Sequence, residues 1–400
     1  MTDGRSKMKV TVLGSTGSIG QSTLDVIRRN RERFQVHALV AGRNVEALCL
    51  QIEEFSPSVA VVANQEDIPR IRQILSGRGI AEPQLAWGSK AYLEVATAPE
   101  TDFLMSSIVG VAGLEATFEA IRAGKKIGLA NKETLVAAGA LVMGEVKRRG
   151  VELIPVDSEH NGAHQCLRAG RRAEATKLIL TASGGPFRRT SKSDMAKVTP
   201  EQALNHPTWK MGPRITVDSA TLMNKGFEVI EACWLFDFPV EQVEVVVHPQ
   251  STVHAMVEYN DGSVIAQVCA TDMRMPIQYA LTWPERAPAP VPRLEWAQPR
   301  TWEFEPPDMD RFPLLKLAYQ AQAGGGSLTA TLNAADEIAV EAFLDRRISF
   351  PAIAEVVEET LSRVGRLEPK TIGDVLEIDG RSRQVARAVA AELGAWAEAH

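Results

Sequence analysis

The stretch "KVTVLGSTGSIGQSTLDVIRRN" (residues 9–30) decides the fold. An apolar run typical of a strand ends at Gly14, and an amphipathic helical pattern follows almost at once. Gly14, Gly17 and Gly20 lie at this turn, where glycine permits tight geometry and lets backbone N–H groups approach a pyrophosphate at the helix N-terminus. The G-x-x-G-x-x-G spacing is less common than G-x-G-x-x-G, so a glycine-rich turn that holds no ligand stays an alternative.

The same alternation of strand and helix continues through the first part of the chain. Short apolar runs predict further strands at 35–41, 59–63, 103–110, 126–130 and 151–156. Helical patterns lie between them, for example at 113–124. Short strands separated by helices indicate a parallel sheet covered on both faces, which is a doubly wound fold.

The pattern changes after about residue 177. One more strand is expected within 177–187, then a helix at 224–236 and an antiparallel hairpin at 252–268 that turns at Asn-Asp-Gly. A proline-rich stretch follows, and the last part carries only helical spacing. We therefore predict an α/β protein with an N-terminal doubly wound Rossmann-like parallel sheet, a central α+β catalytic domain and a C-terminal helical bundle.

The length and composition of the chain exclude several classes of protein. A length of 400 residues exceeds what one hydrophobic core usually serves. The formal net charge of −6 argues against a general nucleic-acid surface, and no apolar run is long enough to span a bilayer. The opening residues carry no secretory signal. We expect a cytoplasmic enzyme without a nucleic-acid or membrane partner.

The end of the second predicted strand indicates which dinucleotide the glycine turn would bind. An NAD site usually has Asp or Glu here, to bind the ribose hydroxyls. This chain instead has "VAGRN" (40–44), with Arg43 and Asn44 and no acid. A cation at this place favours the 2′-phosphate of NADP, although Arg43 as an ordinary surface arginine is the alternative.

An acidic cluster follows the last strand of the first sheet, in "PVDSEHNGAH" (155–164). If the chain stays extended there, Asp157 and Glu159 point the same way. Oxygen ligands favour Mg²⁺ or Mn²⁺. Glu228, within "VDSATLMNKGFEVIEACW" (217–234), offers a third carboxylate. A solvated loop and an ordinary amphipathic helix with a Lys/Glu pair stay open as alternatives.

Polar groups suited to a phosphorylated substrate lie along the same region. Ser219, Asn224 and Lys225 are of the kind that hold a phosphate, and Lys132 follows another strand end. The segment from Ser183 to residue 214 is long for a loop, and such loops are often lids. Within it "TPEQ" (199–202) predicts a helix start with a capping box.

These motifs in series resemble one family, 1-deoxy-D-xylulose 5-phosphate reductoisomerase. The matching stretches include "GSTGSIG", "LANKETLV", "PVDSEHN", "HPTWKMG" and "TVDSATLMNKGFEVIEA", in family order along nearly the whole chain. The resemblance implies an NADPH-dependent oxidoreductase that also needs Mg²⁺ or Mn²⁺. It would isomerise and reduce 1-deoxy-D-xylulose 5-phosphate to 2-C-methyl-D-erythritol 4-phosphate in non-mevalonate isoprenoid biosynthesis. It also implies a homodimer.

The resemblance further implies roles for single residues. The metal ligands would be Asp157, Glu159 and Glu228, which with Lys132 form the catalytic set. The substrate, a phosphorylated sugar, would contact Lys132, Ser158, Glu159, Ser183, His206, Trp209, Met211, Ser219, Asn224, Lys225 and Glu228. Phosphate would be held by Ser183, Ser219, Asn224 and Lys225. The cofactor would contact Thr16, Gly17, Ser18, Ile19, Gly42, Arg43, Asn44, Asn131, Glu133 and Gly212.

The same resemblance suggests how the chain is divided. We expect an NADPH-binding domain at 1–156, a catalytic and metal-binding domain at 157–291 with a lid loop at about 183–213, a linker at 292–318 and a helical domain at 319–400. Departures from the family pattern are few: Arg43 stands where lysine is frequent, Gly162 and His164 replace bulkier apolar residues, and the surroundings of Met273 vary. None removes a proposed ligand.

Two other functions are compatible with parts of the pattern. A metal-dependent NADP hydroxyacid dehydrogenase would transfer hydride without rearranging a carbon skeleton, but the phosphate-type residues argue against a simple hydroxyacid substrate. An NADP-sensing binding protein without catalysis would have no need for Lys132 beside three carboxylates.

Overall fold

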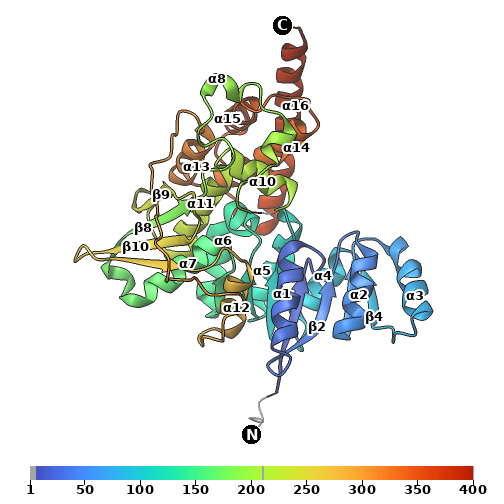
Figure 1. Cartoon of the computed structure of the whole chain (residues 1–400). Helices are drawn as coiled ribbons and strands as arrows, with labels where there is room; N and C mark the ends of the chain where they lie inside the picture. The colour runs from blue at the N-terminus through green and yellow to red at the C-terminus, as the bar shows by residue number, and fades with distance from the viewer. Residues whose placement is uncertain (1–5, 210, 400) are drawn as a thin grey trace. The chain divides into compact units, whose positions relative to one another are not determined.

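The computed structural model describes residues 6–209 and 211–399 (Figure 1). They group into two compact units, each assembled from separate stretches of chain. The first unit comprises Met1–Thr134, Val142–Asn161 and Asp272–Arg293. The second unit comprises Leu135–Leu141, Gly162–Thr271 and Leu294–His400.

A seven-stranded parallel sheet forms the centre of the first unit. Its spatial order is β4-β3-β2-β1-β5-β6-β7, so the order reverses between β1 and β5. In open α/β sheets the ligand crevice lies at such a reversal, beyond the carboxyl ends of the strands. The strands are β1 Met8–Leu13, β2 Phe34–Val40, β3 Val59–Val62, β4 Gln84–Trp87, β5 Phe103–Ser106, β6 Lys126–Leu129 and β7 Leu153–Pro155.

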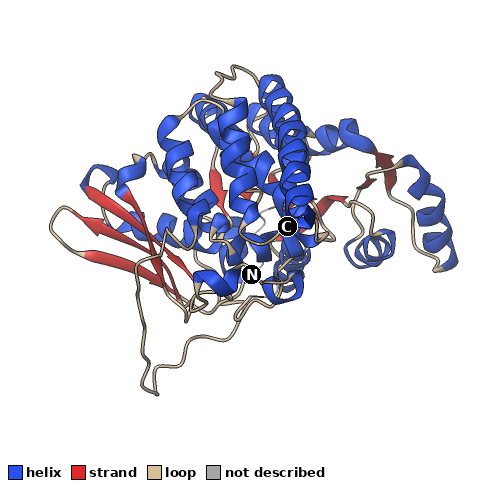
Figure 2. Cartoon of the chain, turned by 90° about the horizontal axis from the view of Figure 1, so that it is seen from above, coloured by secondary structure: helices blue, strands red, loops and turns tan. Residues whose placement is uncertain are grey.

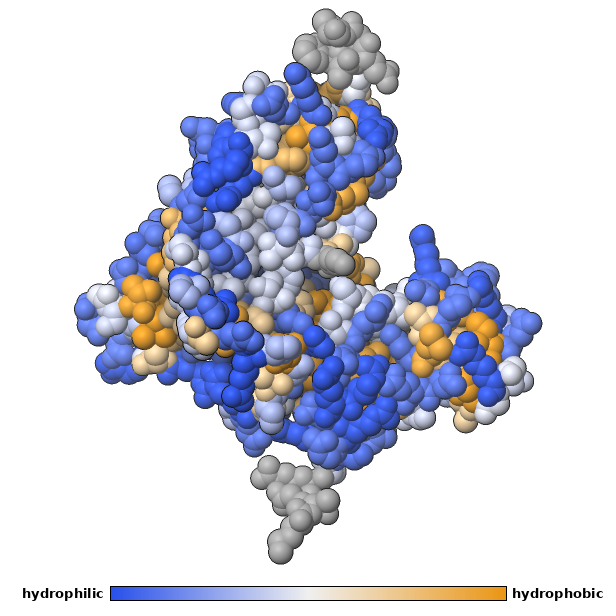
Figure 3. Space-filling view, viewed as in Figure 1, coloured by the Kyte–Doolittle hydropathy of each residue, from blue (hydrophilic) through white to orange (hydrophobic). Residues whose placement is uncertain are grey.

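Helices follow the strands as in other doubly wound sheets, so the predicted fold of this part is confirmed. They are α1 Ser18–Arg29, α2 Val45–Phe55, α3 Ile68–Gly77, α4 Gly88–Thr97, α5 Leu114–Arg122 and α12 Arg274–Thr282. Two more, α6 Glu133–Arg149 and α7 Ser158–Cys166, have residues in both units. Hydrophilic side chains cover α1, whereas apolar ones gather on the surface over α2 (Figure 3).

The core of the first unit includes a late segment of the chain. Apolar side chains of β1, β2 and α1 pack in one cluster with Ile277 and Leu281 of α12. Arg274 at the start of α12 also reaches α1, where its Nη1 donates to Asp25 Oδ2 at 3.1 Å. The sheet therefore depends on residues that follow it by more than a hundred positions.

The second unit contains a four-stranded sheet of mixed direction (Figure 2). Its strands are β8 Ala175–Ala182, β9 Val243–Val247, β10 Val253–Tyr259 and β11 Val264–Val268, in the order β11-β10-β8-β9. β10 runs antiparallel to β8 and β11, and β8 is parallel to β9. The hairpin predicted at 252–268 is confirmed, with Gly262 at φ 83° in its turn.

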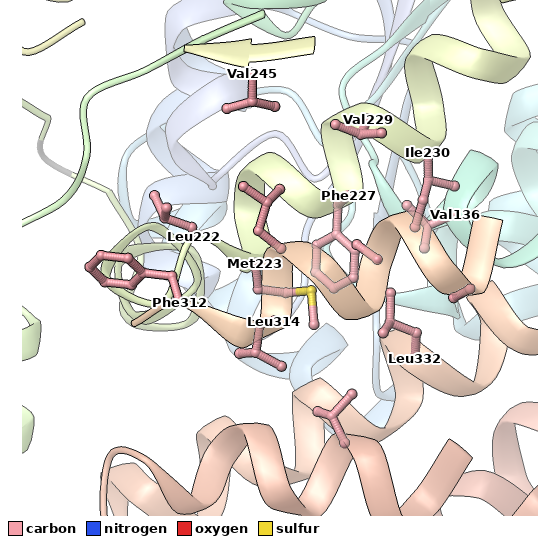
Figure 4. Close-up of a cluster of buried hydrophobic side chains, with 14 of the residues drawn as sticks. Val136, Leu222, Met223, Phe227, Val229, Ile230, Val245, Phe312, Leu314 and Leu332 are labelled. Atoms are coloured by element: carbon pink, nitrogen blue, oxygen red, sulfur yellow. The ribbon is translucent and has the colours of Figure 1, made fainter. Parts of the chain in front are cut away.

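Helices make up the rest of the second unit, which confirms the predicted helical C-terminal region. They are α8 Lys192–Met195, α9 Pro200–Ala203, α10 Pro213–Ala220, α11 Met223–Phe236, α13 Pro313–Gly324, α14 Leu328–Leu344, α15 Ala352–Val364 and α16 Ile372–Ala399. Their core joins α11 to α13 and α14: Figure 4 shows Met223 and Phe227 of α11 among Leu314 and Leu332. This core holds the helix that carries Glu228.

The structure departs from the sequence-based expectation at several elements. The chain is not extended at 157–159, because α7 begins at Ser158. β5 ends at Ser106, earlier than the predicted 110. The strands β4 and β9 were not predicted. Finally, α13 begins at Pro313, within the stretch 292–318 expected to be a linker.

Among the described helices, none combines the length and the apolar character that crossing a bilayer requires.

Candidate active-site residues

The turn after β1 has the geometry that a dinucleotide phosphate needs. Gly14 lies at φ 82°, and a Cβ there would come within 2.6 Å of Ser107 O. A Cβ on Gly20 would come within 2.3 Å of Gly14 O, so helix α1 approaches the turn as closely as only glycine permits. Gly17 is the N-cap residue of α1, so the cap has no side chain that could accept a hydrogen bond from the N–H groups of the first turn. This leaves Thr16, Gly17, Ser18 and Ile19 around an uncapped helix N-terminus, which favours an anion.

The end of β2 lies at the same edge of the sheet, since β1 and β2 are parallel with Leu13 opposite Val40. Gly42, Arg43 and Asn44 are all exposed there. Asn44 caps α2 by accepting a hydrogen bond from Ala47 N at 3.1 Å. Arg43 is thus an exposed cation at the edge of the sheet where the glycine turn lies.

The residues after β6 divide into two roles. Asn131 Nδ2 donates to Gly110 O at 2.9 Å, and Glu133 Oε1 accepts from Gly110 N at 2.9 Å. These two side chains hold the loop after β5 in place. Lys132 points elsewhere and forms an ion pair with Asp157.

Asp157 follows β7 and has a second task besides pairing with Lys132. Its Oδ1 accepts hydrogen bonds from Glu159 N at 3.0 Å and His160 N at 3.3 Å. Asp157 is therefore the N-cap of α7, and Glu159 lies in the first helical turn, where a negative charge is favourable. Ser158 Oγ donates to Glu159 Oε1 at 3.0 Å. The geometry that presents the two carboxylates is a helix N-terminus and not an extended strand.

A histidine-centred group lies in the second unit. His206 Nε2 lies 3.0 Å from Ser183 Oγ and 3.1 Å from Ser219 Oγ. Its Nδ1 accepts from Thr208 N at 3.1 Å and from Trp209 N at 2.9 Å. Because Nδ1 accepts from two backbone N–H groups, the proton of the neutral ring lies on Nε2. Burial lowers the pKa of His206, which keeps the ring neutral.

The beginning of α11 carries the second polar group of this unit. Asn224 Nδ2 donates to Glu228 Oε1 at 2.6 Å, and Lys225 forms a buried ion pair with the other oxygen of Glu228. Glu228 has no exposed surface. Leu222, at φ 62°, makes the sharp turn from α10 into α11. The turn places Ser219 at the end of one helix and Asn224 and Lys225 in the first turn of the next.

The expected lid has partial internal structure. Thr199 and Gln202 form the predicted capping box at the start of α9: Thr199 N donates to Gln202 Oε1 at 2.9 Å. Trp209 is held through His206, and Met211 is half-buried. Gly212 caps α10 and accepts from Thr216 N at 3.1 Å. Ser183 is followed by Gly184 and Gly185, both at positive φ.

The sequence-predicted residues thus form four groups. The first unit contains the glycine turn with Arg43 and, further along the sheet, Lys132 with Asp157 and Glu159. The second unit contains Ser183, His206 and Ser219 together, and Asn224, Lys225 and Glu228 together. One group was missed: Arg214 lies within ion-pair distance of both Asp218 and Asp336. The chain between Asp218 and Asp336 is too long for spacing to reveal their pairing.

Family models match most of the chain. Residues 10–139 match 1-deoxy-D-xylulose 5-phosphate reductoisomerase, residues 153–236 match a C-terminal domain of the same enzyme, and residues 268–385 match the DXP reductoisomerase C-terminal domain.

Curated relatives agree over nearly full length. The chain is 63% identical over 384 residues to the 1-deoxy-D-xylulose 5-phosphate reductoisomerase of Solibacter usitatus, covering 95% of this chain and 97% of the relative. It is 50% identical over 389 residues to that of Burkholderia pseudomallei, covering 97% and 98%.

Solved structures are similar in fold as well as sequence. The reductoisomerase from Zymomonas mobilis in complex with NADPH superposes with a TM-score of 0.90 at 46% identity, covering 96% of this chain and 99% of the other. DOX-P reductoisomerase in complex with NADPH, fosmidomycin and magnesium gives a TM-score of 0.90 at 39% identity, covering 96% and 98%. The chain belongs to the 1-deoxy-D-xylulose 5-phosphate reductoisomerase family.

Proposed function

We infer that this chain isomerises and reduces 1-deoxy-D-xylulose 5-phosphate to 2-C-methyl-D-erythritol 4-phosphate, with NADPH as reductant and a divalent metal ion. The observation that carries the inference is the 63% identity over nearly the whole chain. The solved relatives support the cofactors, since one binds NADPH and another binds NADPH, fosmidomycin and magnesium. A simple hydroxyacid dehydrogenase would not need the phosphate-type residues of the second unit.

Asp157, Glu159 and Glu228 are the proposed metal ligands, each offering a carboxylate oxygen. An oxygen-only set fits a hard ion such as Mg²⁺ or Mn²⁺. Asp157 and Glu228 each have a lysine partner, which supplies positive charge to a carboxylate that burial would otherwise disfavour. When bound, the metal supplies a Lewis acid for the carbonyl and hydroxyl oxygens of the substrate.

The remaining residues bind and orient the substrate in this proposal. Ser183, Ser219, Asn224 and Lys225 take the phosphate. His206 is neutral and donates from Nε2, so it orients the two serine hydroxyls without adding charge. Lys132 and Ser158 contact the sugar.

The cofactor and the lid complete the arrangement. NADPH binds at the uncapped start of α1, with Arg43 beside its 2′-phosphate. Trp209 and Met211 belong to the lid that excludes water during rearrangement and hydride transfer. The proposal also includes manganese as an alternative metal, a role in non-mevalonate isoprenoid biosynthesis, a homodimeric assembly and action in the cytoplasm. The residue roles and the domain boundaries given above belong to it as well.

The decisive experiment follows NADPH absorbance. We expect oxidation only when both 1-deoxy-D-xylulose 5-phosphate and Mg²⁺ or Mn²⁺ are present, arrest by a chelator, and recovery when metal is added in excess. 1-Deoxy-D-xylulose, which lacks the phosphate, is the matched control and should react far more slowly. No turnover of the phosphorylated substrate with metal present would overturn the proposal.

A further inference from the structure

Two buried acids lie around one cation next to the proposed phosphate site: Nε of Arg214 is 3.8 Å from Asp218 Oδ2, and Nη2 of Arg214 is 3.9 Å from Asp336 Oδ2. Asp218 is on α10, next to Ser219 in the chain, and Asp336 is on α14. Asp218 is 4% exposed and Asp336 has no exposed surface. Two carboxylates at one dry site cannot both be ionised without a large cost, unless cations and hydrogen-bond donors compensate both.

Asp336 lacks that compensation within the described residues. Neither of its oxygens receives a hydrogen bond there from an N–H or O–H group. Its Oδ2 lies 3.9 Å from Nη2 of Arg214. That nitrogen donates instead to Asn333 Oδ1 at 2.9 Å, and Nη1 donates to Glu337 Oε2 at 3.1 Å. The guanidinium is therefore directed at other acceptors.

The charged side chains next to Arg214 form ion pairs with one another. Glu337 Oε2 also accepts from Arg383 Nη2 at 2.8 Å, and Arg383 Nε donates to Asp379 Oδ2 at 2.6 Å. Burial is the largest cause that raises the pKa of Asp336 well above its usual range, and the negative charge of Asp218 is the next. The positive charge of Arg214 lowers this pKa and only partly offsets the two. A neutral carboxylic acid can donate one hydrogen bond, which a carboxylate cannot.

We propose that Asp336 is a positioning residue that carries a proton and donates it in a hydrogen bond to the Asp218 carboxylate, which fixes α10 and the Ser219 hydroxyl for the phosphate of the substrate. The inference rests on the proposed role of Ser219 in binding phosphate. Arg214 strengthens the same attachment, because it lies at the end of the lid and ties α10 to α14 through Asn333 and Glu337.

Three variants of the full-length enzyme test this role. Asp336→Asn keeps a neutral side chain with an N–H donor, and should leave the KM for the sugar phosphate within about twofold of wild type. Asp336→Leu has similar size but no donor, so it should raise that KM about tenfold while kcat falls less than about threefold and the KM for NADPH is unchanged. Asp379→Asn removes another buried acid of this unit, one that is paired with Arg383; it is the control for general destabilisation and should leave the KM for the sugar phosphate unchanged.

An infrared difference spectrum between wild type and Asp336→Asn tests the proton directly. We expect the carbonyl band of a protonated carboxylic acid in the wild type at neutral pH, and its absence in the variant. This comparison decides the question of the proton even if Asp336→Leu does not fold.

The outcomes separate the two proposals. An absent carboxylic-acid band, or an Asp336→Asn variant with the same raised KM as Asp336→Leu, would overturn the positioning role. An unchanged KM in Asp336→Leu would also overturn it. No turnover by the wild type would contradict the proposed function instead, and the infrared result would still report on the proton of Asp336.

Discussion

Glu228 shares its two carboxylate oxygens between Asn224 and Lys225 and has no contact with solvent. A fully buried carboxylate of this kind is stable because its neighbours compensate it, and removing its charge leaves Lys225 with a weaker partner. At the scale of single residues the proposed chemistry therefore depends on charges that the surroundings already hold in fixed positions.

Replacing Glu228 by Gln should abolish turnover, because the amide keeps the shape but loses the charge that attracts a divalent cation. We expect kcat/KM to fall about a thousandfold or more, while the Kd for NADPH, measured by cofactor fluorescence, changes less than about twofold. Glu244→Gln, which removes an acid paired with Lys177 at 2.7 Å on the surface, is the control. Loss of NADPH binding in Glu228→Gln would contradict the assigned role.

Arg43 offers a second test at this scale. Arg43→Ala should raise the KM for NADPH about tenfold and leave the weaker use of NADH nearly unchanged, since only NADPH has the 2′-phosphate. The exposed Arg70, which pairs with Glu46, is the matched arginine whose replacement by Ala should have no effect. Equal losses with both dinucleotides would argue that Arg43 does not recognise the phosphate.

At the scale of secondary-structure elements, the junction between β1 and α1 is set by close packing. A Cβ on Gly20 would meet backbone atoms of the glycine turn, whereas a Cβ on Gly144, an exposed glycine of α6, would meet nothing within 4 Å. Both glycines lie in helices. Comparing a substitution at each therefore separates the effect of helix propensity from the effect of contact with the turn.

Gly20→Ala and Gly144→Ala should therefore act in opposite directions. Gly144→Ala is expected to raise the free energy of unfolding by about 0.5–1 kcal/mol, because alanine is the better helix former. Gly20→Ala should lower it by about 1–3 kcal/mol and weaken NADPH binding, because the turn has to shift. Urea denaturation and cofactor titration measure both, and equal stabilisation by the two changes would show that the turn adapts freely.

Sequence patterns predicted most helices and strands. They failed for elements that are very short or whose conformation is decided by tertiary contacts. The first sheet, the hairpin, the capping box of Thr199 and the C-terminal helices all carry local signals. The edge strand β4 is only four residues long and lacks a buried run, so its sequence has no clear strand pattern. The helix start at Ser158 has a local signal, since Asp157 is followed by an acid in the first helical turn. The same residues also fit an extended continuation of the strand, and only the hydrogen bonds of Asp157 decide between the two.

The candidate site shows the same division. Family motifs named the residues, and the structure adds how each is held: Asp157 as a helix cap, His206 as a donor between two serines, Asn131 and Glu133 as supports of a loop. The pairing of Asp218 with Asp336 joins α10 to α14 through the fold alone, so no spacing in the sequence indicates it.

At the scale of the whole molecule, the stability of the chain should depend on a histidine outside the proposed site. Burial, helped by the charge of Arg168, lowers the pKa of His164 on α7 from 6.5 to about 4. The unfolded chain therefore binds a proton in this range that the folded chain does not. The stabilising contribution is complete above about pH 6.5 and is lost as the pH falls toward 4.

The expected result is a loss of up to about 3 kcal/mol of unfolding free energy from this residue between pH 6.5 and 4. His164→Gln, which does not titrate, should show a shallower decline over that window than the wild type in urea denaturation series. Parallel pH profiles for the two proteins would show that His164 does not carry this dependence.

The first unit draws on three separate stretches of the chain, and α12 supplies Ile277 and Leu281 to its core. A contiguous N-terminal fragment such as 1–156 would thus expose apolar surface that α12 covers in the intact chain, and would lose the bond from Arg274 to Asp25 on the proposed cofactor helix. Truncation at that point should give an aggregating product, whereas fusing 272–293 to the fragment through a flexible linker should restore solubility. Synthesis on the ribosome faces the same constraint, since the cofactor-binding sheet is completed only after the residues of α12 have emerged.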